Sequence, residues 1–155
     1  MRVGIHESSR SVEEITTHCL DTDVNEIFLR ANSLPGVDQL GHLTPENFKP
    51  FEDMLQKRDV RVYGMIVPVP SKEAVLGQHE AELDSLCQTL RDIGQSGIDT
   101  VLFYPLDRLI YFHEYHRGRS LMVIPCEEGW SAIIEFFRRA VSVVDEVNLK
   151  LANHL

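Results

Sequence analysis

The residues best able to do chemistry stand where short apolar segments of this chain end. They are a histidine, an arginine, a tyrosine with an aspartate nearby, and a second histidine: His6, Arg30, Tyr104, Asp107 and His154. The planar fork of Arg30 can hold a carboxylate through two parallel hydrogen bonds. The imidazole of His154 suits Mn, Fe, Ni or Zn. Two plainer roles stay open, a salt bridge for Arg30 and a terminal position without function for His154.

Strands must position these residues, and the sequence predicts five of them, separated by helices. The apolar segments expected to be strands are Arg2–His6, Asn25–Arg30, Arg61–Val69, Asp99–Tyr104 and Asn148–Asn153. The segments expected to be helices run from Ser11 to Leu20, from Pro45 onward, from Gln78 to Ser96 and from Trp130 to Val147. Such alternation without hairpins predicts a parallel sheet with right-handed crossovers, and we expect sequential strand order.

Local signals support the helices. Ser11 and Glu14 have the spacing of a capping box, and Gly97 stands where a left-handed residue ends a helix. The run around Met65 is apolar enough for a strand that is buried on both faces. One helix carries Phe48, Phe51, Met54 and Leu55 on a single apolar stripe, which we expect to face the core. The last helix is apolar at Ile133, Ile134, Phe137, Val141 and Val144, and we expect Phe137 in the core.

Two architectures fit this order, a doubly wound sheet and a (β/α) barrel. Gly4 is the single glycine of the first strand, so no GxGxxG fingerprint follows that strand, and no GxxxxGK[ST] loop occurs. A full (β/α)₈ barrel needs about 250 residues. The 155 residues predict an incomplete barrel of about five strands and four helices. A genuine five-stranded domain with an edge strand remains the alternative.

Composition limits the partners. The chain has 15 Lys and Arg against 24 Asp and Glu, a formal charge of −9, which argues against nucleic acid and anionic membranes as partners. The three cysteines, Cys19, Cys87 and Cys126, are far apart, as is usual for reduced thiols of cytoplasmic proteins. We therefore expect a cytoplasmic protein.

Most of the chain resembles the xylose-isomerase-like (β/α) barrels of the TIM type, most specifically in its second half. The segment from Gly77 to Pro105, with Gln88-Thr89-Leu90-Arg91-Asp92-Ile93 before Gly97-Ile98-Asp99-Thr100-Val101, is similar to the third helix and fourth strand of these barrels. Within that superfamily the chain is most similar to the N-terminal half of the mannonate dehydratases. The stretch after Tyr104, residues 106–128, is similar to their hairpin-like insertion after strand four.

The resemblance implies a lyase that dehydrates D-mannonate to 2-keto-3-deoxy-gluconate with a divalent metal, Mn or Fe. It implies substrate contacts from His6, Arg30, Tyr104 and Asp107 and a metal ligand at His154, with the catalytic residues unassigned. We expect residues 1–155 to form one domain that is inactive as a lyase by itself. A sugar isomerase or epimerase of the same superfamily, or a non-catalytic module that self-associates through its last strand, are the alternatives.

Overall fold

The computed structural model describes residues 4–7, 11–31, 34, 45–68, 70–104, 114–116, 119–121 and 127–153. Its elements are β1 (Ile5–Glu7), α1 (Val12–Thr22), β2 (Glu26–Arg30), α2 (Pro45–Gln56), β3 (Arg61–Pro68), α3 (Lys72–Val75), α4 (Glu80–Gln95), β4 (Thr100–Tyr104), β5 (Glu114–His116), β6 (Arg119–Leu121), α6 (Glu127–Glu146) and β7 (Lys150–Asn153). None of the described helices combines the length and apolar character needed to cross a lipid bilayer.

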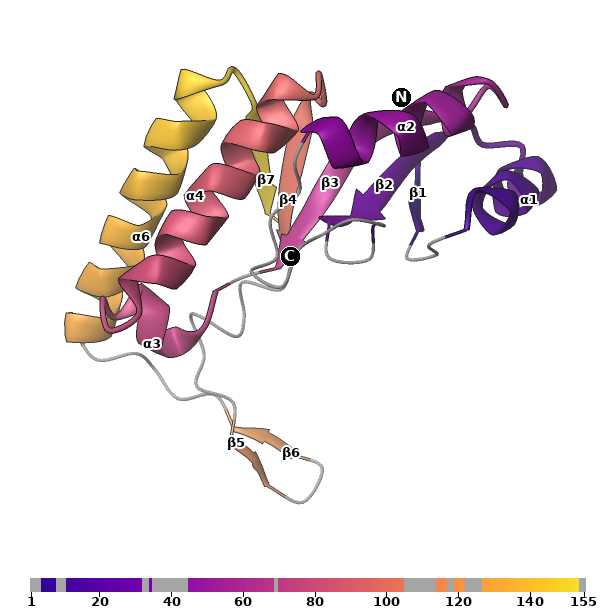
Figure 1. The fold of residues 1–155 in the computed structure, drawn as a ribbon. Coiled ribbons are helices and arrows are strands. Elements are labelled where there is room, and N and C mark those ends of the chain that lie inside the picture. The colour runs from indigo at the N-terminus through magenta and orange to yellow at the C-terminus, as the bar shows by residue number, and fades with distance from the viewer. Residues whose placement is uncertain are drawn as a thin grey trace.

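Five strands form one parallel sheet in the order β1-β2-β3-β4-β7 (Figure 1). The predicted parallel sheet with sequential strand order is therefore confirmed. With sequential order and right-handed crossovers, every connecting helix falls on the same side of the sheet. The antiparallel pair β5–β6 lies within residues 106–128, in which we predicted a hairpin-like insertion. That residues 106–128 are an insertion stays a prediction.

The turns from helix to strand share one feature of backbone conformation. Each helix end is followed by a residue with positive φ, namely Asp23 (53°), Asp59 (60°), Gly97 (81°) and Asn148 (55°). In three of these turns the next residue is apolar and its N–H bonds the carbonyl five positions earlier: Val24 to Cys19, Val60 to Leu55, and Leu149 to Val144. This is the Schellman pattern, which satisfies carbonyls that a helix end leaves unpaired. The left-handed conformation predicted at Gly97 is confirmed.

The helix starts are also set by nearby side chains. The Ser11 hydroxyl accepts a bond from the Glu14 N–H at 3.3 Å, so the predicted N-cap of α1 is confirmed. The one-turn helix α3 was not predicted. Ser71 caps it by accepting from the Ala74 N–H at 3.2 Å, and the Ser71 N–H and hydroxyl both bond the Glu82 carboxylate at 2.6 Å. Glu82 belongs to α4, so sequence spacing around Ser71 alone could not reveal this arrangement.

One hydrophobic core joins all four long helices to the sheet. Its most buried large side chains include Phe48, Leu55, Met65, Leu90 and Phe103, each at most 1% exposed. The expected burial of the stripe from Phe48 to Leu55 was wrong at Met54, which is 43% exposed, and the apolar Ile134 (48%) and Val141 (41%) also lie outside the core. Each of these helices is apolar over a wider arc than its neighbours in the described structure cover.

Helices α4 and α6 lie close together along a seam of small residues and ion pairs. A Cβ at Gly94 would lie 2.6 Å from the Val147 Cβ, so glycine permits this close approach. Arg91 bonds the Glu146 carboxylate through two of its nitrogens at 3.2–3.3 Å. Arg139 pairs with both Glu80 and Asp84 of α4. These contacts fix which flank of α6 faces α4.

Candidate active-site face of the sheet

The face of the sheet that the helices leave open is the place to look for a site. In β2 the residues alternate, with Ile27 and Leu29 in the core and Phe28 and Arg30 partly exposed. Because side chains alternate across a strand, Phe28 and Arg30 point away from the helices. Helices α1, α2, α4 and α6 pack against the other side (Figure 1). This second face, termed the open face below, corresponds to the interior side of a barrel.

The strand register groups residues on the open face into rows. Arg30 pairs with Ile66, which pairs with Leu102. One pleat nearer the amino ends of the strands, Phe28 pairs with Gly64, which pairs with Thr100. Gly64 is required here because an added Cβ would lie 2.5 Å from Phe28 Cε1 and 2.8 Å from the Thr100 carbonyl oxygen. Among the six residues of these two rows, Arg30 is the charged member and Thr100 the polar one, and the other four are apolar or glycine.

The register also places two other predicted residues by their backbone positions. His6 pairs with Phe28, and Tyr104 lies two residues beyond Leu102, at the carboxyl end of β4. The positions of His6, Arg30 and Tyr104 therefore fall on one face of the sheet. Asp107 and His154 lie outside the described residues, so their predicted roles stay predictions.

Arg30 has an unusual electrostatic environment. Its Nε is buried and has no hydrogen-bond partner among the described residues, and no ion pair to it occurs within them. The alternative role of Arg30, a structural salt bridge, is therefore not supported by the described part of the chain. A buried donor without a partner costs about 1–3 kcal/mol, which an anionic ligand would recover. A carboxylate is one anion whose geometry fits an arginine donor.

Thr100 also has an unpartnered polar atom on this face, and the sequence analysis did not identify this residue. Its hydroxyl oxygen is buried and unpartnered in the described structure, and the residue is 6% exposed. The sequence signal that could have identified Thr100 is a hydroxyl-bearing residue at the start of a buried strand. Both unsatisfied side-chain atoms found in the described residues therefore lie on the open face.

No metal site is complete in the described part of the chain. Among these residues, no three His, Cys, Asp or Glu side chains come close enough to hold an ion together. The described residues thus do not supply the ligand set that the resemblance implies. His154, the predicted ligand, lies outside them.

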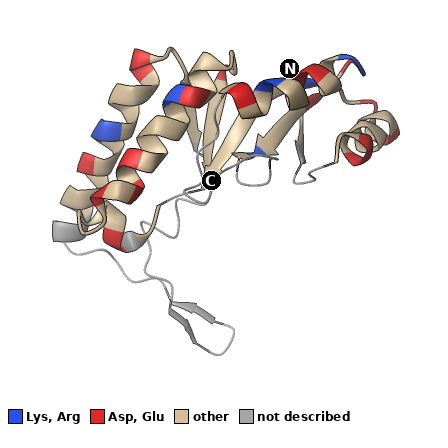
Figure 2. Cartoon of the chain, viewed as in Figure 1, with Lys and Arg blue, Asp and Glu red and all other residues tan. Residues whose placement is uncertain are grey.

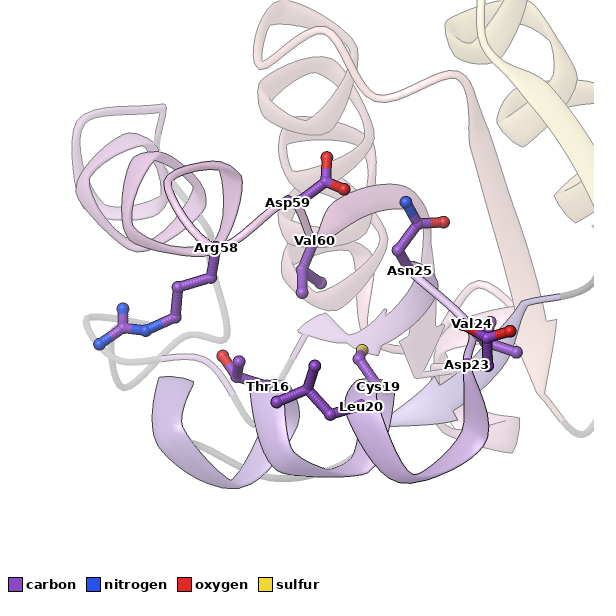
Figure 3. Close-up of a pocket in the computed structure, with 9 residues that line it drawn as sticks. All are labelled: Thr16, Cys19, Leu20, Asp23, Val24, Asn25, Arg58, Asp59 and Val60. Carbon is purple, nitrogen blue, oxygen red and sulfur yellow. The ribbon is translucent and has the colours of Figure 1, made fainter.

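A separate pocket lies at the amino ends of the strands, between the end of α1 and the turn that joins α2 to β3. Its volume is about 320 Å³, and Figure 3 shows Leu20 and Val60 beside it and Arg58 extending outward. The lining residues are Thr16, Cys19, Leu20, Asp23, Val24, Asn25, Arg58, Asp59 and Val60. In parallel (β/α) structures chemistry gathers at the carboxyl ends, so this pocket is the weaker candidate.

The charges outside the open face belong mainly to the helices. Figure 2 shows acidic residues along α1, α2, α4 and α6. Hydrogen bonding to Glu146 raises the pKa of Arg91, and hydrogen bonding to Glu80 raises the pKa of Arg139. These cations are held by acids of their own surface, which distinguishes them from Arg30.

Comparison with known proteins gives structural matches only. The sequence matches no family model and no curated protein. Among solved structures, mannonate dehydratase from Streptococcus suis serotype 2 is similar, with a TM-score of 0.68 and 13% identity over 99% of this chain and 53% of that chain. An L-ribulose 3-epimerase gives 0.65 and 15% identity over 98% and 48% of the two chains. D-psicose 3-epimerase from Clostridium cellulolyticum H10 gives 0.63 and 11% over 97% and 51%.

These matches identify the fold. The chain has the parallel α/β architecture of the TIM-barrel structures it matches, and it spans about half their length. The predicted fold class, an incomplete barrel, and the predicted resemblance are confirmed at the level of fold. At identities of 11–15%, the comparisons carry the fold and no particular activity.

Proposed function

We propose that the open face binds a sugar acid and that the chain takes part in a lyase reaction, the dehydration of D-mannonate to 2-keto-3-deoxy-gluconate. The observation that carries this proposal is the buried, unpartnered Nε of Arg30 near the carboxyl ends of the strands. Arg30 would hold the substrate carboxylate, and His6, Tyr104 and Asp107 would contact its hydroxyl groups. The fold of the matched mannonate dehydratase supports the proposal.

The setting of Arg30 favours a carboxylate for a physical reason. Its row neighbours, Ile66 and Leu102, are apolar, and Ile66 is 4% exposed. A guanidinium beside apolar side chains attracts an anion more strongly than one surrounded by water, because less solvent screens the pair. In a dehydration, the proton that must leave is on the carbon bonded to the carboxylate. A carboxylate held by Arg30 would therefore keep that carbon close to the guanidinium. Arg30 would thus bind the substrate and help to disperse the charge that develops when that proton leaves.

The alternative is a sugar epimerase of the same superfamily. The TM-scores of the two epimerases, 0.65 and 0.63, are close to the 0.68 of the dehydratase, so fold similarity does not separate the activities. A neutral ketose, however, has no anionic group to pair with Arg30. The unpartnered guanidinium nitrogen therefore favours the sugar acid.

His154 is the only residue of this chain that we propose as a metal ligand. A divalent ion, Mn or Fe, would take its other ligands from residues beyond those described, and we derive no reaction step through it. The proposed cytoplasmic location fits the buried Cys19 and Cys87. A non-catalytic role is the remaining alternative, and it predicts that no sugar binds.

Binding of D-mannonate, measured by isothermal titration calorimetry, tests the proposal, because the chain alone is expected to be inactive. We expect binding of D-mannonate, weaker binding of D-tagatose, and at least a tenfold loss of mannonate affinity in Arg30→Gln. Arg30→Lys should lose part of the affinity, since an ammonium keeps the charge without the fork.

Arg61→Gln is the matched control. Arg61 lies on the neighbouring strand, is half exposed, and already pairs with Asp99 at 3.3 Å, so its replacement should leave mannonate binding unchanged. Equal affinity for mannonate and tagatose, insensitive to Arg30→Gln, would support the epimerase. Absence of binding to either sugar, with and without Mn²⁺, would contradict both enzymatic hypotheses.

A further inference from the structure

The pocket at the amino ends of the strands is enclosed by two neighbouring βα units of this chain. Its lining residues come from the end of α1, the turn before β2 and the turn before β3 (Figure 3). Glu13 pairs with Arg58 at 3.5 Å, so the flank of α1 that carries Glu13 faces the turn after α2. Leu20 lies seven residues further along α1, within about 20° of Glu13 around the helix axis. Leu20, which is 77% exposed, therefore faces this same turn across the pocket.

Two aspartates occupy corresponding positions in the two turns that line the pocket. Asp23 follows α1 with a φ of 53°, and Asp59 follows α2 with a φ of 60°. The turns lie side by side, because the strands that follow them pair from Glu26 and Arg61 onward. Within the part of the chain that the structure describes, neither carboxylate has a hydrogen-bond or ion-pair partner. The pocket therefore presents two carboxylates whose charge is not neutralised.

The backbone conformation of these turns does not require an acidic side chain. The two other turns from helix to strand have the uncharged Gly97 and Asn148 at the corresponding position. An acid is also electrostatically unfavourable there, because the carboxyl end of a helix carries partial negative charge. Neither α1 nor α2 has a basic residue in its last turn to offset this effect. Asp23 and Asp59 thus lower the stability of the free protein, as residues kept for binding commonly do.

Arg58 is the cation among the described lining residues, and its charge is already paired outside the pocket. Its guanidinium bonds the Met54 carbonyl at 3.3 Å and the Glu13 carboxylate at 3.5 Å. Figure 3 shows Arg58 extending away from the pocket, with Asp59 and the Asn25 amide along one rim. The charges in the pocket therefore favour a cationic ligand over an anionic one.

We propose that this pocket binds a small aliphatic diammonium ion, with one ammonium group at Asp23, the other at Asp59, and the methylene chain over Leu20 and Val60. The two turns are about one strand spacing (~4.8 Å) or more apart, so two linked ammonium groups match them better than one. Each ammonium group donates up to three hydrogen bonds, and a carboxylate accepts them. The methylene chain would remove apolar surface of Leu20 from water.

The size and composition of the pocket limit the alternatives. Its volume, about 320 Å³, is at the lower end of the range for small-molecule sites, so the ligand should be short. A bare metal ion fits less well, because no group of three His, Cys, Asp or Glu side chains able to hold one occurs among the described residues.

Titration of the isotope-labelled full chain with butane-1,4-diammonium, followed by two-dimensional NMR of the backbone amides, tests the proposal. Both carboxylates are exposed and screened by solvent, so we expect a Kd on the order of 1 mM that rises with added salt. The amide signals of Leu20, Asp23 and Asp59 should shift. Butylammonium, with one charge, should bind about fivefold more weakly, and butyrate, an anion, should leave these signals in place.

A pair of double variants separates the pocket from the overall charge of the chain. Asp23→Asn combined with Asp59→Asn should weaken diammonium binding at least tenfold and raise Tm, because two acids leave the helix ends. Asparagine adopts a positive φ readily, as Asn148 does in this chain, so the turns should remain intact. The matched control, Asp21→Asn combined with Asp53→Asn, removes two exposed acids of the same helices outside the pocket and should leave binding unchanged.

The methylene chain has its own test, Leu20→Ala, which should weaken butylammonium but not methylammonium, because methylammonium has no chain to pack on Leu20. Equal loss of affinity in the two double variants would show attraction by overall charge and would overturn the proposal. Equal affinities for the diammonium and butylammonium, binding of butyrate, or absence of any shift at about 20 mM diammonium, far above the expected Kd, would overturn it as well.

Discussion

Replacement of Arg30 by methionine should make the protein more stable. The buried Nε of Arg30 has no partner in the described structure, and such a group costs about 1–3 kcal/mol. The side chain is partly exposed, so its outer end reaches solvent and the gain should be near the lower limit, about 1 kcal/mol. Methionine keeps the apolar stem that packs beside Ile66 and removes the donor. A gain in stability from loss of a functional group is the expected trade-off at a binding site.

Thermal and urea denaturation followed by circular dichroism measure this effect. For a chain of this length, about 1 kcal/mol corresponds to a rise in Tm of about 2–4 °C. Ligand should stabilise the unmodified protein and leave the variant nearly unchanged. At ten times its Kd, D-mannonate should stabilise the unmodified protein by about 1.4 kcal/mol and Arg30→Met by a negligible amount.

Arg61→Met supplies the control, because Arg61 pairs with Glu26 at 3.8 Å and Asp99 at 3.3 Å while half exposed. Loss of these surface pairs should lower stability by about 0.2–1 kcal/mol. If Arg30→Met destabilises the protein by as much as Arg61→Met or more, Arg30 has a structural partner. The argument from its unpartnered nitrogen would then fail.

Two further predictions concern the open face and the first helix. Gly64→Ala should destabilise the protein by about 1–3 kcal/mol in urea denaturation, since the new Cβ would lie 2.8 Å from the backbone oxygen of Thr100; an unchanged midpoint would show that the strands move apart freely. A backbone hydrogen bond at the start of α1 and a hydrogen bond with Ser11 lower the pKa of Glu13. The stabilising effect of the ionised Glu13 side chain is therefore present above the ordinary pKa of glutamate and is lost as the pH falls through the lowered value. Ser11→Ala should raise that pKa in an NMR titration and cost about 1 kcal/mol of stability at neutral pH as the N-cap is lost; an unmoved pKa would contradict this assignment.

The sequence by itself determined the features that depend on near neighbours along the chain. The Ser11 cap acts over three residues and the turns at Asp59 and Asn148 act over five, so their chemistry is local. The strand–helix alternation then left few arrangements for a parallel sheet, which is why the strand order could be predicted. Arg30 could be nominated because it closes an apolar segment.

Only the tertiary structure decided which of these residues share a face and which lack a partner. The row from Arg30 through Ile66 to Leu102 depends on the register of three strands far apart in sequence, including an irregularity between Ile27 and Phe28. Likewise, α3 depends on Glu82 of another helix, and the exposure of Ile134 depends on where α4 lies. A periodic pattern shows that a helix has an apolar side, but the neighbours that cover it are set by packing, so burial and pairing are properties of the assembled fold.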